Sequence, residues 1–226
     1  MYPYFHFTLR IINCVSGPPK TVRRGGRAKR PYELGKRLAQ SDGKRRAILS
    51  AARNVLASKG FLEFTMDGLA RDSGVTRQTV HNLFGTKTEL LEAVFDQLAA
   101  EGGMEGMRRV MQESDPKRTA MAFAEVFSNF WSKDRLLLRR IHGIGAMDPE
   151  FAGALAARNR RRWMAATRGF ERLGLQEDAI ARLYALTSFE FFDVLAEASG
   201  EQRAGELVGG MVQRELGVGP SASSGD

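Results

Sequence analysis

The chain of 226 residues is 43% hydrophobic, enough for a packed core in one large domain or two small ones, and its single cysteine, Cys14, excludes an internal disulfide and a multi-cysteine metal site. No apolar run reaches the roughly 18 residues that span a bilayer, so no transmembrane helix is expected and a reducing cytoplasmic location is the default. The net charge of +8 is uneven, with 17 Lys and Arg against 7 Asp and Glu in residues 1–95 and 17 against 19 in residues 96–226, which predicts a polyanionic partner for the N-terminal part only.

Residues 1–40 are predicted to be a disordered basic extension. Its first nineteen residues, MYPYFHFTLRIINCVSGPP, are apolar and aromatic but lack the basic start and small-residue cleavage site of a signal peptide. We interpret them as a poorly ordered extension or the product of an upstream start codon, with a docking or membrane-surface role as the alternative. Five basic residues then crowd into eight positions, as a solvated tail or as an arm that lies along phosphates or enters a minor groove. They are Arg23, Arg24, Arg27, Lys29 and Arg30.

Residues 41–86 have the pattern of three helices. The first is expected to begin near Asp42 and to end at Gly60, with a buried stripe at helical spacing. The stripe consists of Ile48, Ala52, Val55 and Leu56. A short second helix should follow Thr65, whose hydroxyl can cap it, and should end at Gly74, which can adopt the left-handed conformation.

A third helix is expected to begin near Thr76, and its polar and apolar side chains segregate. At about 100° per residue, one set lies within roughly 140° on one face. That set is Arg77, Gln78, His81 and Asn82. Val80 and Leu83 point the other way, toward a core. Because Arg, Gln and Asn can bond to base edges, this face has the chemistry to read a DNA major groove.

The fourth helix is predicted from the capping box Thr86-Lys87-Thr88-Glu89, and its N-terminus could hold a phosphate beside Lys87. Further helices are expected at 116–131, 133–143, 149–173, 176–199 and 201–216. We therefore predict an all-α fold with a helix-turn-helix DNA-binding domain at 41–86 and a second helical domain at 87–217, to which a family resemblance, and not the helix pattern, assigns effector binding and dimerisation. Residues 218–226 are predicted to be a disordered tail.

The segment from Arg45 to Gln97 resembles the DNA-binding domain of the tetracycline-repressor (TetR) family of bacterial transcription regulators. The matching residues are Gly60-Phe61, Thr65-Met66, Leu69-Ala70, Gly74-Val75, Thr79-Val80, Phe84, Lys87 and Leu90-Leu91. Two positions depart from the family pattern, which usually has Tyr in place of His81 and often an aromatic residue in place of Leu83. That Tyr commonly contacts a phosphate.

The candidate DNA contacts divide into two roles. Arg77, Gln78 and Asn82 are the candidates for reading bases. Residues expected to position the helix on phosphates are Thr65, Thr76, Thr79, His81 and Lys87.

Helix 176–199 is apolar on most sides, which indicates either a central core helix or a subunit interface. The resemblance implies the latter, with two helices from each of two subunits forming a four-helix bundle. The expected interface residues are Ile180, Leu183, Tyr184, Phe191, Val194, Leu195, Leu207, Val208, Met211 and Val212.

The middle of the chain is rich in aromatic residues and methionine, which either pack a core or, as the resemblance implies, line an apolar effector cavity. The candidate lining is Phe123, Phe127, Phe130, Trp131, His142, Met147, Phe151, Trp163 and Met164. His142, with Arg139 and Arg140, could supply polar groups, although His142 could also be a satisfied core residue. Arg158, Arg160, Arg161 and Arg162 are interpreted as a solvated face, with an acidic effector or partner site as the alternative.

The expected function is that of a homodimeric transcription regulator, a repressor released from a palindromic operator by a hydrophobic or aromatic effector. Its partners would be double-stranded operator DNA and a second copy of the chain, with no membrane partner. The alternative is an activator or a constitutive DNA-binding protein without an effector. The sequence has no phosphate-binding loop, nucleophile motif or metal-ligand spacing, so we expect no enzyme activity and no cofactor.

Overall fold

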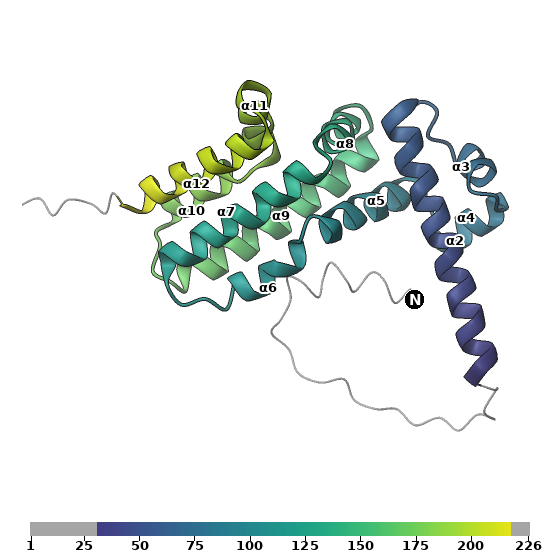
Figure 1. Ribbon diagram of the computed structural model, residues 1–226, viewed down its shortest axis with the longest axis horizontal. Coiled ribbons are helices and arrows are strands. Elements are labelled where there is room, and N and C mark those ends of the chain that lie inside the picture. Colours follow the sequence, from purple (N-terminus) through teal and green to yellow (C-terminus); the bar gives the residue numbers. More distant parts are fainter. Residues whose placement is uncertain (1–30, 218–226) are drawn as a thin grey trace, which may run out of the picture.

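The computed structural model describes residues 31–217, with side chains from residue 39 onward, and every regular element within that range is helical. Figure 1 shows α2, α3 and α4 at one end of the molecule and α10, α11 and α12 toward the other, with α5 and α8 between them. The elements are α2 (Pro31–Ser58), α3 (Met66–Asp72), α4 (Arg77–Phe84), α5 (Lys87–Glu101), the 3₁₀ turn η1 (Met104–Gly106), α6 (Met107–Val110), α7 (Pro116–Lys133), α8 (Arg135–Met147), α9 (Pro149–Glu171), α10 (Glu177–Leu186), α11 (Phe189–Ser199) and α12 (Glu201–Gly217). The predicted all-α fold is confirmed.

One continuous core runs from the three-helix unit into the second domain. Ile48 of α2 and Val80 of α4 are fully buried, and they pack with the apolar face of α5. That face is Leu90, Leu91, Val94, Phe95 and Leu98. Because α5 also contacts α7 and α9, the same helix closes the core of the N-terminal unit and joins it to the rest.

The first helix begins earlier than the sequence predicted. It starts at Pro31 instead of near Asp42, so residues 31–40 belong to α2 and not to the extension. Proline suits the first position of a helix because its missing N–H would have no partner there. The following residues are mostly good helix formers, and the glycines at 35 and 43 do not interrupt them. Residues 1–30 and 218–226, including the predicted arm, lie outside the described residues.

The helix predicted at 176–199 is two helices, α10 and α11, separated at Thr187 and Ser188. The Thr187 hydroxyl donates to the carbonyl of Leu183 at 2.8 Å, and Ser188 caps α11 by accepting from the N–H of Phe191 at 3.2 Å. Serine and threonine bond readily to nearby backbone, which allows them to end one helix and begin another. Helix α5 ends at Glu101, directly before Gly102.

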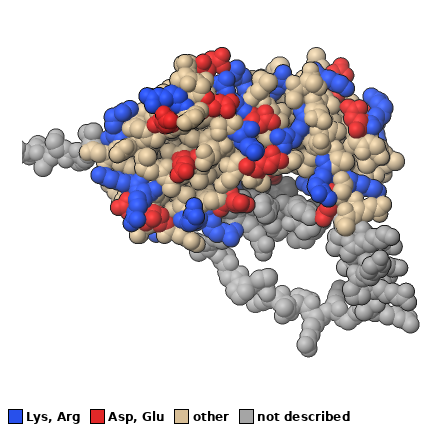
Figure 2. Space-filling view, viewed as in Figure 1, with Lys and Arg blue, Asp and Glu red and all other residues tan. Residues whose placement is uncertain are grey.

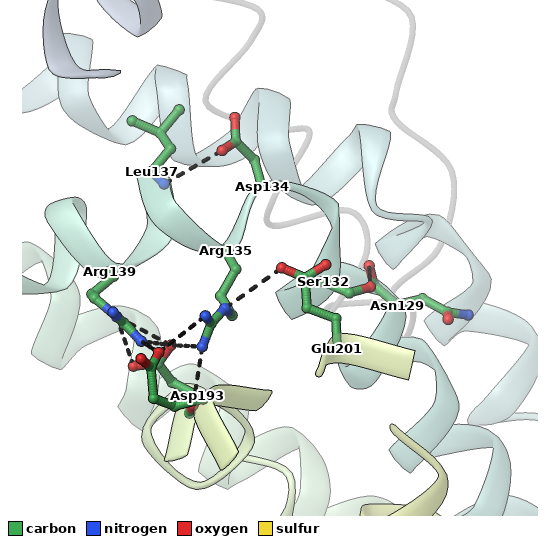
Figure 3. Close-up of polar contacts among 9 residues, drawn as sticks. Asn129, Ser132, Asp134, Arg135, Leu137, Arg139, Asp193 and Glu201 are labelled. Carbon is green, nitrogen blue, oxygen red and sulfur yellow. Dashed lines mark hydrogen bonds and ion pairs between the residues drawn. The ribbon is translucent and has the colours of Figure 1, made fainter. Parts of the chain in front are cut away.

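Charged side chains fasten α8 to α11 and α12. Figure 3 shows Arg135 and Arg139 of α8 converging on Asp193 of α11, with Arg135 also directed toward Glu201 of α12. The ion-pair distances to Asp193 are 3.1 Å from Arg135 and 2.9 Å from Arg139. Glu197 joins both arginines, at 3.1 and 2.8 Å. The network therefore fixes α11 and the start of α12 on the end of the bundle.

Two further arginines connect the N-terminal unit to the second domain. Arg53 of α2 pairs with Glu101 at 2.8 Å and with Asp134 at 3.2 Å. Arg140 of α8 donates to the carbonyls of Leu56 and Ala57 at the end of α2. A cation at a helix C-terminus also interacts favourably with the helix dipole. None of the helices in the described part of the chain has the length and apolar character to cross a membrane.

Candidate functional site

Two threonine caps set the geometry of the helix-turn-helix. Thr65 accepts from the N–H of Gly68 at 3.1 Å and starts α3, and Thr76 accepts from the N–H of Thr79 at 3.1 Å and starts α4. Between them Gly74 has a φ of +67°, in the left-handed region that favours glycine. The predicted cap at Thr65 and turn at Gly74 are therefore formed, and the helix predicted to begin near Thr76 starts with a threonine cap of its own.

The outer face of α4 carries the polar side chains that the sequence placed there. Arg77, Gln78, His81 and Asn82 are all exposed, and Thr79 is half-buried. Val80 and Phe84 are buried on the opposite face, whereas Leu83 is only half-buried and packs against the core. The structure thus brings the predicted base-reading residues together on one exposed face, next to Thr65 and Thr76.

Neighbouring groups already orient several of these side chains. Arg77 Nη1 lies 3.2 Å from Asp67 Oδ2 of α3. Gln78 Nε2 donates to Asn82 Oδ1 at 2.8 Å, one turn further along α4. These contacts reduce the number of conformations that the side chains sample before they meet a partner.

Lys87 does not lie on the exposed face. Its Nζ is 3.6 Å from the ring centroid of Phe61 and 5.8 Å from that of Phe64, and burial lowers the pKa of its ammonium group. The Thr86–Glu89 capping box also forms, and it uses backbone N–H groups at the N-terminus of α5. Lys87 is therefore part of the packing around Phe61 in this structure.

Arg45 makes a contact that the sequence did not predict. It donates from α2 to the carbonyl of Leu83 at 3.3 Å, and its guanidinium lies 4.5 Å from the ring centroid of Phe84. It therefore secures the C-terminal end of α4. The only sequence signal was the basic run Lys44-Arg45-Arg46, which does not distinguish a packed arginine from a solvated one.

The aromatic residues proposed to line an effector cavity pack largely against one another. The ring centroids of Phe127 and Trp131 are 5.7 Å apart, and those of Phe130 and Trp131 are 4.4 Å apart. Phe123 continues the cluster at 4.8 Å from Phe127, and Phe189 of α11 lies 5.5 Å from Trp131. Except for Phe189, these residues lie on α7 at helical spacing.

The remaining predicted lining residues have different surroundings. Phe151 is buried, and Trp163 stacks edge-on to Tyr184 at 5.2 Å. Met147 and Met164 are 70% and 53% exposed, so they lie outside the aromatic cluster. Their exposure depends on which sides of α8 and α9 face solvent, and the composition of the sequence does not indicate this.

The proposed polar groups are also redistributed. His142 lies beside the cluster, 4.4 Å from the Phe189 ring, with its Nδ1 3.2 Å from Glu190 Oε1. This hydrogen bond lowers the pKa of Glu190 to about 2. Arg139 instead pairs with Asp193 and Glu197, and Arg140 donates to the carbonyls of Leu56 and Ala57. Arg162, interpreted from sequence as part of a solvated face, is partly buried and bonds to Tyr184 and Thr187.

The predicted dimer residues form two groups. Four of them are already buried within a single chain: Ile180, Leu183, Val208 and Val212. The other six retain exposed surface: Tyr184, Phe191, Val194, Leu195, Leu207 and Met211. Val194 is the most open of these six, at 70% exposure.

The charges on the face shown in Figure 2 are mixed, with blue and red side chains alternating over the described surface. A shallow hollow lies between α8 and α11, away from the predicted effector lining. Its walls are Arg139, Asp193, Val194, Glu197 and Ala198. Because Arg139 is paired with both acids there, the hollow presents no unpaired arginine to a ligand.

Comparison with known proteins matches the N-terminal unit to one family. The model of "Bacterial regulatory proteins, tetR family" matches residues 48–94, from within α2 to within α5. The HTH-type transcriptional regulator EthR of Mycolicibacterium smegmatis is 27% identical over 188 residues, which cover 79% of this chain and 82% of that protein. The HTH-type transcriptional regulator SrpR of Pseudomonas putida is 39% identical over 59 residues, 26% of this chain and 28% of that protein.

The fold has close counterparts among solved structures. NalD, the secondary repressor of the MexAB-OprM multidrug efflux pump in Pseudomonas aeruginosa, superposes with a TM-score of 0.61 at 20% identity. The superposition covers 78% of this chain and 96% of NalD. At this identity the likeness concerns the fold, and it extends through the second domain.

Proposed function

We propose that this chain, which belongs to the TetR family of bacterial regulatory proteins and is therefore a DNA-binding transcriptional regulator, acts as a homodimeric repressor in the cytoplasm. The observation that carries the proposal is the exposed polar face of α4, an eight-residue helix capped by Thr76 and contacted at its C-terminal end by Arg45. The family relatives are regulators and not enzymes, which agrees with the absence of catalytic motifs from the sequence.

In this proposal α4 enters a major groove. Arg77 would bond to guanine, and Gln78 and Asn82 would bond to adenine after exchanging their mutual hydrogen bond for base contacts. Exposed Thr65, Thr76 and His81, with half-buried Thr79, would contact phosphates. Lys87 would reach a phosphate only by leaving the Phe61 ring, so it is the weakest of the proposed contacts.

The proposed dimer uses the apolar residues of α10, α11 and α12 that a single chain leaves partly exposed. Val194 is an apolar side chain that water largely surrounds in the single chain. A two-fold dimer would present two α4 helices to DNA, so the operator would be palindromic with half-sites about 34–36 Å apart or a multiple of that distance.

Release from the operator would follow from binding of a hydrophobic small molecule to the second domain. Such a molecule must bind the conformer with the wrong half-site spacing more tightly than the DNA-bound conformer. Because α5 packs against both the N-terminal unit and the second domain within one continuous core, it would carry the change to α4. The close packing of the aromatic rings favours a second candidate, a constitutive regulator or activator that needs no effector.

The test is selection of duplexes from a random pool by the full chain. We expect an enriched inverted repeat bound by two chains, and transcription from a promoter carrying that repeat should fall when the protein is present. Enrichment of a single half-site would contradict the dimer, increased transcription would contradict repression, and no enrichment at all would contradict sequence-specific binding.

A further inference from the structure

Arg162 of α9 lies among aromatic rings, and Glu190 favours its charge through space without forming an ion pair with it in the described part of the chain. Its guanidinium carbon is 4.5 Å from the ring centroid of Phe127 and 4.1 Å from that of Tyr184. Its Nη2 donates to the Tyr184 carbonyl and to Thr187 Oγ1, at 2.7 Å each. Within the described residues Arg162 forms no ion pair, whereas Arg158, one turn earlier, forms two.

This cation is incompletely satisfied. Its Nε is buried and has no hydrogen-bond partner in the described part of the chain. Burial lowers the pKa of Arg162 to about 10, because the charged form loses water that the surrounding groups do not fully replace. An anion placed against Nε would therefore be stabilised by a charge-assisted hydrogen bond.

A second unsatisfied nitrogen approaches the same aromatic cluster from α8. The Nδ1–H of His142 donates to Glu190, and its Nε2 is buried without a partner among the described residues. The His142 ring lies 6.3 Å from Trp131. Trp131 in turn donates its Nε1–H to the carbonyl of Thr187 at 3.0 Å, and Thr187 is the residue that Arg162 contacts. Trp131, beside His142 of α8, and Thr187, bonded to Arg162 of α9, are therefore joined by one hydrogen bond.

We propose that this cluster receives the carboxylate head of an effector whose body is apolar or aromatic. The inference rests on the proposed ligand-responsive function and adds a chemical class to it. Arg162 Nε–H would donate to one carboxylate oxygen. Protonated His142 would donate Nε2–H to the same head, with Glu190 stabilising the imidazolium from the other side. The rings of Phe127 and Trp131 would contact the body of the ligand.

The same helix connects this cluster to the DNA-binding end. Arg158 is one turn before Arg162 on α9, is only 12% exposed at its side chain, and pairs with Asp96 of α5 at 2.7 Å. It also lies 3.5 Å from Glu92 of α5. A shift of α9 on filling the cluster would therefore be passed directly to α5, which closes the core beneath α4.

The ligand class is tested by titrating the full chain with decanoate and 4-phenylbutyrate and with their matched alcohols, 1-decanol and 4-phenyl-1-butanol. Tryptophan fluorescence reports binding, since Trp131 and Trp163 both lie in this part of the molecule. We expect at least one acid to bind roughly tenfold or more tightly than its alcohol, as a charge-assisted hydrogen bond would give.

Arg162→Met should remove that advantage and leave alcohol binding unchanged. Arg160→Met, on an exposed residue of the same helix, is the matched control.

Three results would overturn the proposal: equal affinity for acids and alcohols, no binding of either acid, or equal weakening of both ligand types by Arg162→Met. Circular dichroism establishes whether the variant is folded. If Arg162→Met does not fold, Arg162→Lys replaces it. Partial loss of the preference for acid then supports the proposal, and an unchanged preference overturns it.

The connection through α9 has a separate readout. Arg158→Met should still bind the acid, but the acid should no longer release the variant from the selected duplex. Normal release would overturn the role of Arg158. DNA binding without ligand is measured in parallel. Absence of DNA binding would overturn the proposed regulatory function. The acid and alcohol titrations would still test the carboxylate site.

Discussion

Arg77 occupies the first position of α4, where its guanidinium lies 3.2 Å from a carboxylate of Asp67 on α3. Both side chains are largely exposed, at 71% and 55%, so the pair adds little to stability. Its effect is on orientation, because an arginine held by one carboxylate presents its remaining N–H groups in a restricted direction.

Arg77→Ala should therefore weaken binding to the selected operator by about 1–3 kcal/mol and relax its sequence preference, with little change on a scrambled duplex. Fluorescence anisotropy at one fixed salt concentration measures both. Arg203→Ala, on an exposed arginine of α12, is the control and should change neither. Equal weakening on both duplexes would show that Arg77 contacts only the DNA backbone.

Glu190 gives a pH-dependent prediction. Its pKa is lowered from 4.5 to about 2, chiefly by the hydrogen bond from His142. A lowered pKa in the folded state means that the contribution to stability is present above about pH 4.5 and is lost as the pH falls toward 2. The side chain is 70% exposed, so solvent screening should limit this contribution to about 1 kcal/mol.

Glu190→Gln should accordingly be less stable than the unmodified chain at pH 7, and the difference should shrink as the pH falls toward 3. Urea denaturation of both proteins at each pH measures it. A difference that stays constant with pH would mean that the glutamate acts through packing and not through its charge.

Single residues differed in how far the sequence could predict them. The caps Thr65 and Thr76 were predictable, because capping depends on the few residues that follow. The burial of Arg162 was not, because the side of α9 that faces inward depends on how α9 packs against α7 and α10. Periodicity alone does not reveal that rotation when arginines occur on several sides of a helix.

Among the elements, the close approach of α5 and α7 depends on one glycine. A Cβ on Gly102, at the end of α5, would lie 2.7 Å from Phe130 Cα and 2.9 Å from Phe130 Cδ2. Backbone cannot move aside as the end of a flexible side chain can, so only glycine fits there without displacing α7. This glycine is required for space, since its φ of −82° is open to any residue.

Gly102→Ala should destabilise the fold by about 1–3 kcal/mol, the usual cost of forcing extra atoms into a packed site. Gly153→Ala is the matched control, because a Cβ at that position in α9 would meet no atom within 4 Å. Replacing a helical glycine by alanine should stabilise that variant by roughly 0.5–1 kcal/mol. Thermal unfolding separates the two, and equal melting temperatures would contradict the predicted clash.

Element boundaries were predictable where capping residues stand out and were wrong where they do not. The Thr86–Glu89 capping box forms as expected, and α7 and α9 begin at Pro116 and Pro149, where their predicted ranges start. The division between α10 and α11 was missed, because Thr187 and Ser188 lie in an apolar stretch that reads as continuous helix. Burial of Thr187 and its bonds to two other helices stabilise that break, and these are tertiary contacts.

At the scale of the whole molecule, the excess positive charge lies in residues 1–95 and much of it precedes the described helices. Deletion of residues 1–30 removes the five arm residues and leaves α2 complete. If the arm binds DNA, the slope of log affinity against log salt should become shallower by about 0.9 for each phosphate that the shortened chain no longer neutralises. Titrations of both chains on one duplex at several salt concentrations measure this. Identical slopes would show that the arm does not bind phosphates.

The position of α5 has a consequence for protein engineering. Leu90, Leu91 and Leu98 are almost completely buried, although they follow the last residue of the predicted DNA-binding domain. In a chimera joined just after Phe84, the side chains of α5 that pack beneath the helix-turn-helix would come from the other protein. Exchange of operator specificity between regulators should therefore transfer the chain through Glu101 as one cassette, with Gly102 as the natural splice point.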